Sequence, residues 1–475
     1  MQGAGMNYRS LVGNALTAFA AQGISMLVSA AMTLLAPKVM GVVSYGYWQL
    51  FVFYVGYSGF FHLGLNDGIY LIEGGRTREE IDKKAVNSQV AFGVVFQILV
   101  VVVIAAVAVV WAPEAERSFV LFAFAAYTAV YNLSSMLGYI FQAMNETKLF
   151  SFSTMLERLL FLVPMLGMVL LDVSDFRPFI IAYFIARCAS LVYCCWKARD
   201  ILGAGLLSFS ESIRLSLSSI KVGFSLMVAG VADMLILGVA RGLVDYAWGI
   251  EAFAKVSLSL SLVNFFITFV SQASMVLFPA LRQGTDAERR RFYKLLKDGA
   301  EIVFPAAYLL YIPSVIILTL WLPQYAESMR YFAMLLPICA FNTKMDLSCT
   351  TYFKVLREER LLLKVNIITV AASAALSFAG IYLLHSLDAV LLGAVACIVG
   401  RSLWCEGHLD GKMGFPREAL AFEEVLLTVV FVVTSLLLPA EVAFVAYACS
   451  YATYLFVNRK AVHVLFAPIR RRLSK

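Results

Sequence analysis

The chain is built from a succession of apolar segments that are each long enough to cross a membrane as a helix. Such a helix needs about 20 predominantly apolar residues. With 61% hydrophobic and only 15% charged residues, the chain leaves no segment between them that could bury a core of its own. We therefore expect an all-α integral membrane protein with about 14 transmembrane helices, or 12 if the last pair is misread. The predicted spans lie at about 10–34, 42–65, 88–111, 118–140, 149–171, 177–198, 219–241, 252–280, 300–321, 329–352, 361–384, 387–404, 421–438 and 441–458.

The lysines and arginines are concentrated in alternate gaps between these segments. Of the 38, 29 fall on one side, including Lys297 and Arg401, five on the other, and four inside the apolar segments. Loops rich in Lys and Arg stay in the cytoplasm, so we expect a multi-pass protein of the cell membrane with both termini cytoplasmic. The net charge of +7 is then explained by topology and by contact with membrane lipids, and needs no nucleic-acid partner.

Short motifs recur between the two halves of the chain. Residues 36–48 parallel residues 240–249, and the pair Tyr131-Asn132 parallels Phe341-Asn342, at offsets of about 200 to 212. The pattern predicts two parallel six-helix repeats, as in transporters that expose one site alternately to each side of the membrane. Chance similarity between apolar helices is the alternative. The predicted domains are 1–198 and 219–404, joined by a cytoplasmic linker at 199–218, with two C-terminal helices and a basic tail in 405–475.

The opening stretch also carries a family resemblance. Its residues run from Asn14 to Leu34-Leu35-Ala36-Pro37, then Tyr45-Gly46-Tyr47-Trp48-Gln49 and Leu63-Gly64-Leu65-Asn66-Asp67-Gly68. They resemble the Wzx-type polysaccharide flippases of the multidrug/oligosaccharidyl-lipid/polysaccharide exporter superfamily. The resemblance implies alternating-access transfer of an undecaprenyl-pyrophosphate-linked oligosaccharide from the cytoplasmic to the outer leaflet, for surface polysaccharide synthesis. Its implied partners are that lipid-linked substrate, a proton or sodium gradient, membrane lipids and other polysaccharide-assembly proteins.

Two arginines lie near the middle of neighbouring predicted spans. A charge inside the membrane costs roughly 2.5–3.5 kcal/mol on insertion scales and usually faces the bundle interior or a partner. Arg158 and Arg187 are therefore candidates for lining an aqueous lumen, where forked guanidinium donors suit a pyrophosphate or an acidic sugar. The alternative is that Glu157 pairs with Arg187 and holds the helix hairpin together. One acid cannot neutralise two arginines, so some positive charge should remain.

Three further cations are weaker substrate candidates. Lys255 follows Glu251 by four residues, a spacing that favours a local ion pair. Lys344 and Asp346 are two residues apart and should point to different faces of their helix, so that either could face the lumen. Arg241 could belong to an outer cationic rim or act as an interfacial anchor.

Ion coupling requires an acid inside the membrane. Asp233 is the best isolated candidate, followed by Glu157, with Asp346 a third. A buried carboxylate that is not fully paired can exchange a proton. Alternatively, Asp233 could only bond Arg241 or Lys255.

Two other functions compete with a flippase. A multidrug or metabolite antiporter of the same superfamily should have an acidic cavity and commonly an acid in its first span, which has none here. A membrane enzyme of polysaccharide assembly needs a larger domain than gaps such as 199–218, 281–299 and 405–420 allow. The eight cysteines show no C-x-x-C pair and no zinc pattern. We therefore expect a transporter with no catalytic residue, metal or cofactor.

Overall fold

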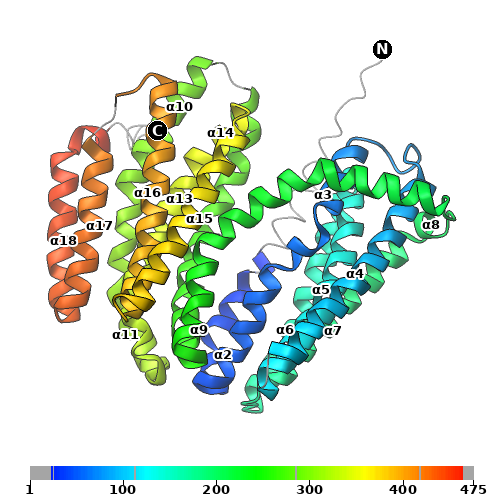
Figure 1. The fold of residues 1–475 in the computed structure, drawn as a ribbon. Helices are drawn as coiled ribbons and strands as arrows, with labels where there is room; N and C mark the ends of the chain where they lie inside the picture. Colours follow the sequence, from blue (N-terminus) through cyan, green and yellow to red (C-terminus); the bar gives the residue numbers. More distant parts are fainter. Residues whose placement is uncertain (1–22, 25, 112–113, 284–285, 417–418, 464–475) are drawn as a thin grey trace, which may run out of the picture. The chain divides into compact units, whose positions relative to one another are not determined.

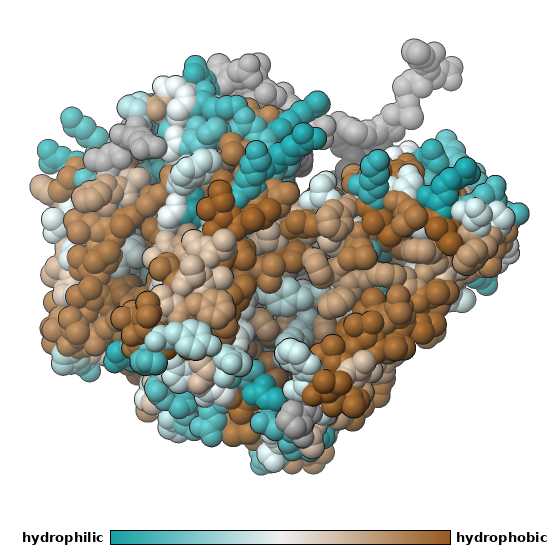
Figure 2. Space-filling view, viewed as in Figure 1, coloured by the Kyte–Doolittle hydropathy of each residue, from teal (hydrophilic) through white to brown (hydrophobic). Residues whose placement is uncertain are grey.

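The computed structural model describes residues 23–24, 26–111, 114–283, 286–416 and 419–463 (Figure 1). Within these ranges the regular elements are all helices, and eleven are long and apolar enough to cross a membrane. The visible face is mainly hydrophobic along the long helices, with hydrophilic side chains gathered toward their ends (Figure 2). An exposed hydrophobic surface of this extent would be unfavourable in water and is typical of a surface that faces lipid. The prediction of an all-α, multi-pass membrane protein is confirmed.

Most predicted spans have a direct counterpart in the described part of the chain. Eight correspond to one helix each: α4 (Lys83–Trp111), α5 (Ala115–Ala143), α6 (Thr147–Leu170), α7 (Arg177–Lys197), α15 (Glu359–Tyr382), α16 (Leu387–Met413), α17 (Ala419–Leu437) and α18 (Ala440–Val457). The second span is α2 (Ala36–Gly56) with the short η1 (Ser58–His62), and α9 (Phe209–Gln283) contains the seventh and eighth. The first span, 10–34, lies largely outside the described residues.

Two predicted spans are broken into shorter helical pieces. The span at 300–321 is made of α10 (Asp286–Val303), η2 (Phe304–Leu310) and α11 (Tyr311–Trp321). The span at 329–352 is made of α12 (Ser328–Leu335), α13 (Pro337–Lys344), a π-helical turn η4 (Met345–Thr350) and α14 (Thr351–Val355). Pro305 and Pro337 each stand at the start of a piece. A proline lacks the N–H that would continue the helix behind it, so the break is encoded locally. The remaining short elements are α3 (Leu65–Glu73), α8 (Arg199–Leu202) and η3 (Pro323–Tyr325).

The chain forms two compact units, which divide between Val231 and Ala232 inside α9. In the first unit, α5 packs against α2, α3, α4 and α7, and α6 packs against α7. In the second unit, α16 packs against α12, α13 and α15, while α17 and α18 lie side by side (Figure 1). The sequence placed the linker earlier, at 199–218, a stretch that contains α8 and the beginning of α9.

The two units share local backbone features at corresponding positions. Gly41 interrupts α2 with φ 72° and ψ 178°, and Gly249 interrupts α9 with φ 76° and ψ −174°, each just before the second predicted span of its half. Only glycine adopts such a conformation without strain. The turn after α5 has a positive φ at Asn145, and the turn after α14 has one at Arg357. In these turns Glu146 N donates to Phe141 O at 2.7 Å, and Glu358 N donates to Phe353 O at 2.8 Å. These matches are what an internal repeat predicts.

Inside the first unit, α3 and the beginning of α9 cross with their backbones in contact. A Cβ added to Gly223 would lie 2.0 Å from Gly64 O and 2.4 Å from Gly68 N. A Cβ added to Gly68 would lie 1.9 Å from Ser219 O. Close to this crossing, Ser219 Oγ donates to Gln89 Oε1 at 2.6 Å. Small residues therefore set how closely these two helices approach, as is common in membrane proteins.

Gly223→Ala should destabilise the protein because its methyl group overlaps backbone atoms, which cannot rotate away as a side chain can. We expect a loss of about 1–3 kcal/mol, seen as a lower thermal unfolding midpoint in detergent. Gly230→Ala on the same helix is the matched control, because nothing lies within 4 Å of the added atom. An equal effect of both substitutions would contradict the close crossing.

A cluster of ion pairs ties together the loops at one end of the first unit. Arg78 pairs with Glu146 at 2.5 Å and with Asp200 at 2.6 Å, and Lys83 pairs with Asp200 at 2.7 Å. Burial raises the pKa of Asp200, but the hydrogen bond from Lys83 and the charge of Arg78 bring it below its ordinary value. A lowered pKa in the folded state means that this carboxylate contributes stability above about pH 4, which is lost as the pH falls further.

Asp200→Asn should therefore lower the unfolding midpoint slightly at neutral pH, and this effect should diminish as the pH falls below about 4. The expected loss is at most about 1 kcal/mol, because the cluster is partly exposed and screened. Thermal unfolding as a function of pH measures it. Glu79→Gln, an exposed acid of the same loop with no ion pair among the described residues, is the control. If the difference in unfolding midpoint between Asp200→Asn and wild type increases toward acid pH, the inferred direction of the pKa shift of Asp200 is wrong.

Candidate functional site

The centre of the first unit contains a buried ion pair between α6 and α7. Arg187 lies at the middle of α7 and is 8% exposed, and Glu157 of α6 is 2% exposed. Arg187 Nη1 donates to Glu157 Oε2, and Nη2 donates to Tyr131 O and Ser135 Oγ, both at 3.3 Å. The guanidinium also lies 4.6 Å from the centre of the Tyr131 ring. Glu157 thus neutralises Arg187 across the hairpin, which is the second of the two alternatives that the sequence left open.

Arg158 has no comparable acid partner. Its Nη1 donates to the Tyr183 hydroxyl at 3.3 Å, and its guanidinium carbon lies 5.9 Å from the centre of the Tyr183 ring. Its Nε is buried without a hydrogen-bond partner. In the described part of the chain no carboxylate forms an ion pair with it, although it stands near the middle of α6. Arg158 therefore keeps a positive charge at mid-helix.

An aromatic cluster holds the Tyr183 ring in place. Tyr183 stacks on Tyr127 at 5.4 Å between centroids and meets Trp48, Phe51 and Phe161 edge-on at 4.9 to 6.2 Å. Each such contact adds about 0.5–1.5 kcal/mol beyond burial and fixes ring orientation. The cluster joins α2, α5, α6 and α7, so the hydroxyl that meets Arg158 is set by four helices.

The second unit has its own central arginine. Arg401 of α16, 5% exposed, donates to Asp233 of α9, to Asn366 Oδ1 of α15 at 3.2 Å and to Asn342 Oδ1 of α13 at 3.1 Å. From the sequence, Arg401 was counted with the cations of a cytoplasmic gap, although it lies three residues before the end of the predicted span at 387–404, and this assignment was wrong. Since α16 runs on to Met413, Arg401 lies well inside it.

Arg187 and Arg401 occupy comparable places in the two units. Each lies on the sixth predicted helix of its half and is held by groups on the fourth and fifth helices. Asn342, which binds Arg401, is the repeat counterpart of Asn132, the neighbour of Tyr131 that binds Arg187. The chemistry differs, because Asp233 is 54% exposed at its side chain whereas Glu157 is enclosed. Asp233 is therefore not the isolated acid that the sequence suggested.

Lys344 and Asp346 point to different surroundings, as their spacing predicted. Lys344 is fully buried and pairs with Glu424 at 2.5 Å and Glu406 at 2.9 Å. Asp346 is half-buried at the π-helical turn η4, and no cation among the described residues forms an ion pair with it. Lys344 is thus engaged by acids.

The remaining two cations are bound locally. Lys255 pairs with Glu327 at 2.5 Å, so the expected pair with Glu251 is wrong. Lys255 lies within α9, six residues after the interruption at Gly249, and Glu327 directly precedes α12. Arg241 donates to Ser257 Oγ at 2.9 Å and lies 4.8 Å from the centre of the Phe253 ring. These partners are different residues from those that contact Arg158 and Arg187.

A second buried charge cluster was not predicted from the sequence. Lys297, which the pattern placed in a loop, is only 3% exposed and pairs with Asp410 at 2.8 Å and Glu406 at 3.4 Å. The signal was present, because Lys297 and Glu301 on α10, and Glu406 and Asp410 on α16, are each four residues apart. It was overlooked because both helices extend beyond the apolar segments that predicted them. In the part of the chain that the structure describes, no group of three or more His, Cys, Asp or Glu side chains has a geometry that could hold a metal ion.

Glu157→Gln should destabilise the first unit strongly because it leaves a buried guanidinium unpaired. The expected loss is about 3–5 kcal/mol, and the double variant Glu157→Gln with Arg187→Met should recover much of it. Unfolding midpoints of the two single variants and the double variant in detergent measure the coupling. Additive losses in the double variant would show that the two side chains do not act as a pair.

Comparisons with known proteins give a likeness of fold. No family model matches the sequence, and no curated protein matches it. Among solved structures, a lipid II flippase MurJ in an inward closed conformation matches with a TM-score of 0.64 at 8% identity, covering 96% of this chain and 99% of its own. An inward-facing multidrug resistance MATE transporter of the MOP superfamily matches at 0.55 and 13%, covering 80% and 94%. The Vibrio cholerae MATE transporter VcmN matches at 0.55 and 14%, covering 87% and 100%.

These structures are flippases and transporters rather than enzymes, in agreement with the class expected from the sequence. Their similarity to this chain extends over most of its length at low sequence identity. The chain is a multi-pass, all-α membrane protein with the fold that these transporters share.

Proposed function

We propose that the protein is an alternating-access flippase of the MOP superfamily, of the Wzx type, that moves a lipid-linked oligosaccharide carrying a pyrophosphate across the cell membrane. Its direction would be from the cytoplasmic to the outer leaflet, in the synthesis of a surface polysaccharide. Both termini would lie in the cytoplasm. The substrate candidates from the sequence were Arg158, Arg187, Lys344, Lys255 and Arg241. Given the contacts described above, we propose Arg158 as the first of these to contact the substrate.

The observation that carries the proposal is the uncompensated charge of Arg158. An arginine at mid-helix is retained only where something offsets its cost. A tyrosine hydroxyl and a ring face solvate the guanidinium, but they leave its charge intact. A transient anionic ligand such as a pyrophosphate or an acidic sugar supplies the missing counter-charge, and the forked donors suit its oxygens.

The extent of the structural match gives a second, weaker support. The match to the lipid II flippase covers 96% of the chain and therefore includes at least part of α17 and α18. The two MATE transporters cover 80% and 87%. The more extensive of these matches is therefore the one to a flippase of a lipid.

The competing function is a cation-coupled antiporter for drugs or metabolites. It draws support from the MATE structures and from the half-exposed Asp233. An acidic drug site needs a carboxylate that is free to bind a cation, whereas Asp233 is bound by Arg401 and Glu157 by Arg187. Of the three candidate acids, this leaves only Asp346 without an ion pair among the described residues. Deletion of the protein should therefore reduce surface polymer and leave drug susceptibility unchanged, and the reverse result would favour the antiporter.

Arg158→Gln should slow flipping by about 10- to 100-fold, the value of one charged hydrogen-bonded contact of about 1.5–3 kcal/mol. The measurement is transfer of an undecaprenyl-pyrophosphate-linked oligosaccharide in proteoliposomes containing the full-length protein. Arg177→Gln is the matched control, since this arginine of the neighbouring helix is partly exposed and paired with Glu116 and Asp175.

Accumulation of undecaprenyl-linked repeat units on the cytoplasmic leaflet of a deletion strain would support the same conclusion independently. Normal surface polymer in that strain would overturn it. Unchanged transfer by Arg158→Gln in a functional assay would remove Arg158 from the substrate path.

A further inference from the structure

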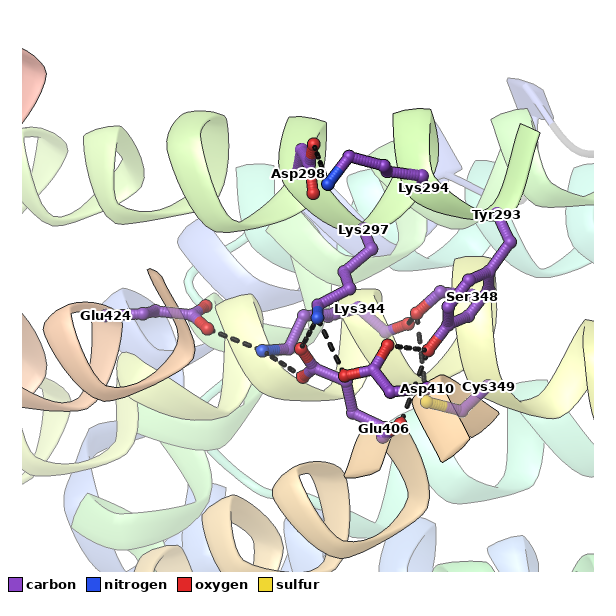
Figure 3. Close-up of polar contacts among 10 residues, drawn as sticks. All are labelled: Tyr293, Lys294, Lys297, Asp298, Lys344, Ser348, Cys349, Glu406, Asp410 and Glu424. Atoms are coloured by element: carbon purple, nitrogen blue, oxygen red, sulfur yellow. Dashed lines mark hydrogen bonds and ion pairs between the residues drawn. The ribbon is translucent and has the colours of Figure 1, made fainter. Parts of the chain in front are cut away.

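The second unit encloses a cluster of six ionisable side chains from four helices, most of which are drawn in Figure 3. Lys344 of α13 lies between Glu406 of α16 and Glu424 of α17, at 2.9 and 2.5 Å. Lys297 of α10 lies between Glu406 and Asp410 of α16, at 3.4 and 2.8 Å. All five side chains are at most 4% exposed. Glu301, the sixth member, is fully buried on α10, one turn after Lys297.

Glu301 is the member of the cluster that lacks a partner. Neither of its carboxyl oxygens receives a hydrogen bond from any described residue. Glu301 belongs to the same cluster, because Lys297, one turn earlier on α10, pairs with Glu406 at 3.4 Å. The nearest hydroxyl of α18 does not help, because Tyr454 donates to the backbone oxygen of Glu301 at 3.2 Å. A fully buried acid without a hydrogen-bond donor requires a ligand, such as a proton, that removes its charge.

The charges of the cluster do not balance when every group is ionised. Four carboxylates face two ammonium groups, all away from water. Other polar groups around them supply no further cation among the described residues; they are Tyr293, Tyr308, Cys349, Tyr451 and Tyr454. Where buried carboxylates outnumber the cations around them, one carboxyl group holds a proton, because burial and like charges both disfavour its ionised form.

The cluster also has an opening. A cavity of about 470 Å³ between α16 and α17 is lined by Glu406 and Asp410, together with Trp404 and Phe422. Both aromatic side chains are exposed, so the cavity reaches the surface of the unit. The cavity therefore gives Glu406 a path to the surface of the second unit that does not pass through its packed interior.

We propose that Glu301 and Glu406 form a proton-binding site, poised by Lys344 and Lys297, through which the second unit responds to a proton gradient. Its ligand is a proton rather than a metal ion, since the described side chains offer no metal geometry. When the proton leaves, the new negative charge draws Lys344 or Lys297 toward the Glu301–Glu406 pair and away from Glu424 or Asp410. This rearrangement links α10, α13, α16 and α17. The site differs from the acids that the sequence singled out, and its role in transport rests on the proposed function.

The first test determines whether Glu301 carries a proton in the purified full-length protein. Infrared difference spectra between about pH 5 and about pH 9 should contain a buried protonated-carboxyl band in wild type, lost in Glu301→Gln and kept in Asp298→Asn. Asp298 is the matched control because it lies on the same helix, one turn earlier, and faces Lys294 (Figure 3). Glutamine is isosteric with a protonated glutamate, so the unfolding midpoint of Glu301→Gln should stay unchanged. A large drop would mean that Glu301 is ionised, and it would overturn the proposal.

The second test measures coupling in proteoliposomes. For one coupled proton, a gradient of one pH unit shifts the distribution of the substrate about tenfold. Glu301→Gln should remove this shift, whereas Glu301→Asp and Asp298→Asn should keep it. If Glu301→Gln keeps both the coupling to the pH gradient and the protonated-carboxyl band, the proposed proton site is wrong. If the wild type shows no protonated-carboxyl band and sodium raises its unfolding midpoint, the ligand of the site is a metal cation, and the proton proposal is overturned. If the band behaves as expected but no lipid-linked oligosaccharide is transferred, the proton site stands and the proposed function fails.

Discussion

The interaction on which this molecule depends is the pairing of charges that cannot reach water. Inside a lipid-exposed helix bundle, each ionised side chain must find an opposite charge, a set of hydrogen bonds or a ligand. The structure meets this requirement in three ways. Glu157 and Arg187 form a closed pair, Arg401 is shared between one acid and two amides, and Lys344 and Lys297 lie among four acids. In each case charged groups from different helices meet, so they also fix which helices pack together.

The exceptions to this pairing are the places where function can be sought. Arg158 has a hydroxyl and a ring but no acid, and Glu301 has no donor at all among the described residues. One is an excess cation and the other an excess carboxyl group, so they require ligands of opposite kinds. An anionic substrate satisfies the first, and a proton satisfies the second. Neither requirement follows from the fold alone, because a shared fold constrains helix packing and leaves the interior charges free to vary.

The sequence predicted the helical class and the apolar segments well because hydrophobicity is a local property of each segment. Every predicted span after the first has a counterpart among the described helices, although 300–321 and 329–352 are present in shorter pieces. The interior charges were predicted less well. Lys297 was assigned to a loop because its helix begins before the apolar stretch, and Arg401 because it lies close to the end of one. Only their distant partners reveal that they are buried. Lys255 was given the nearby acid Glu251 as its partner instead of Glu327, which is far away along the chain. Local spacing shows which pairs are possible, whereas tertiary packing decides which are made.

The internal repeat sharpens the contrast between the two units. Both have a glycine kink with similar backbone angles, the same turn before the fifth helix and an arginine near the middle of the sixth. Against this common framework the first unit has aromatic rings around an excess arginine, while the second has an excess of acids around two lysines. A repeat that began with equal halves has no structural need to differ in this way, because either set of charges could have been replaced by packed apolar side chains of similar volume. The division matches the separate tasks proposed above, with anion binding in one unit and proton exchange in the other.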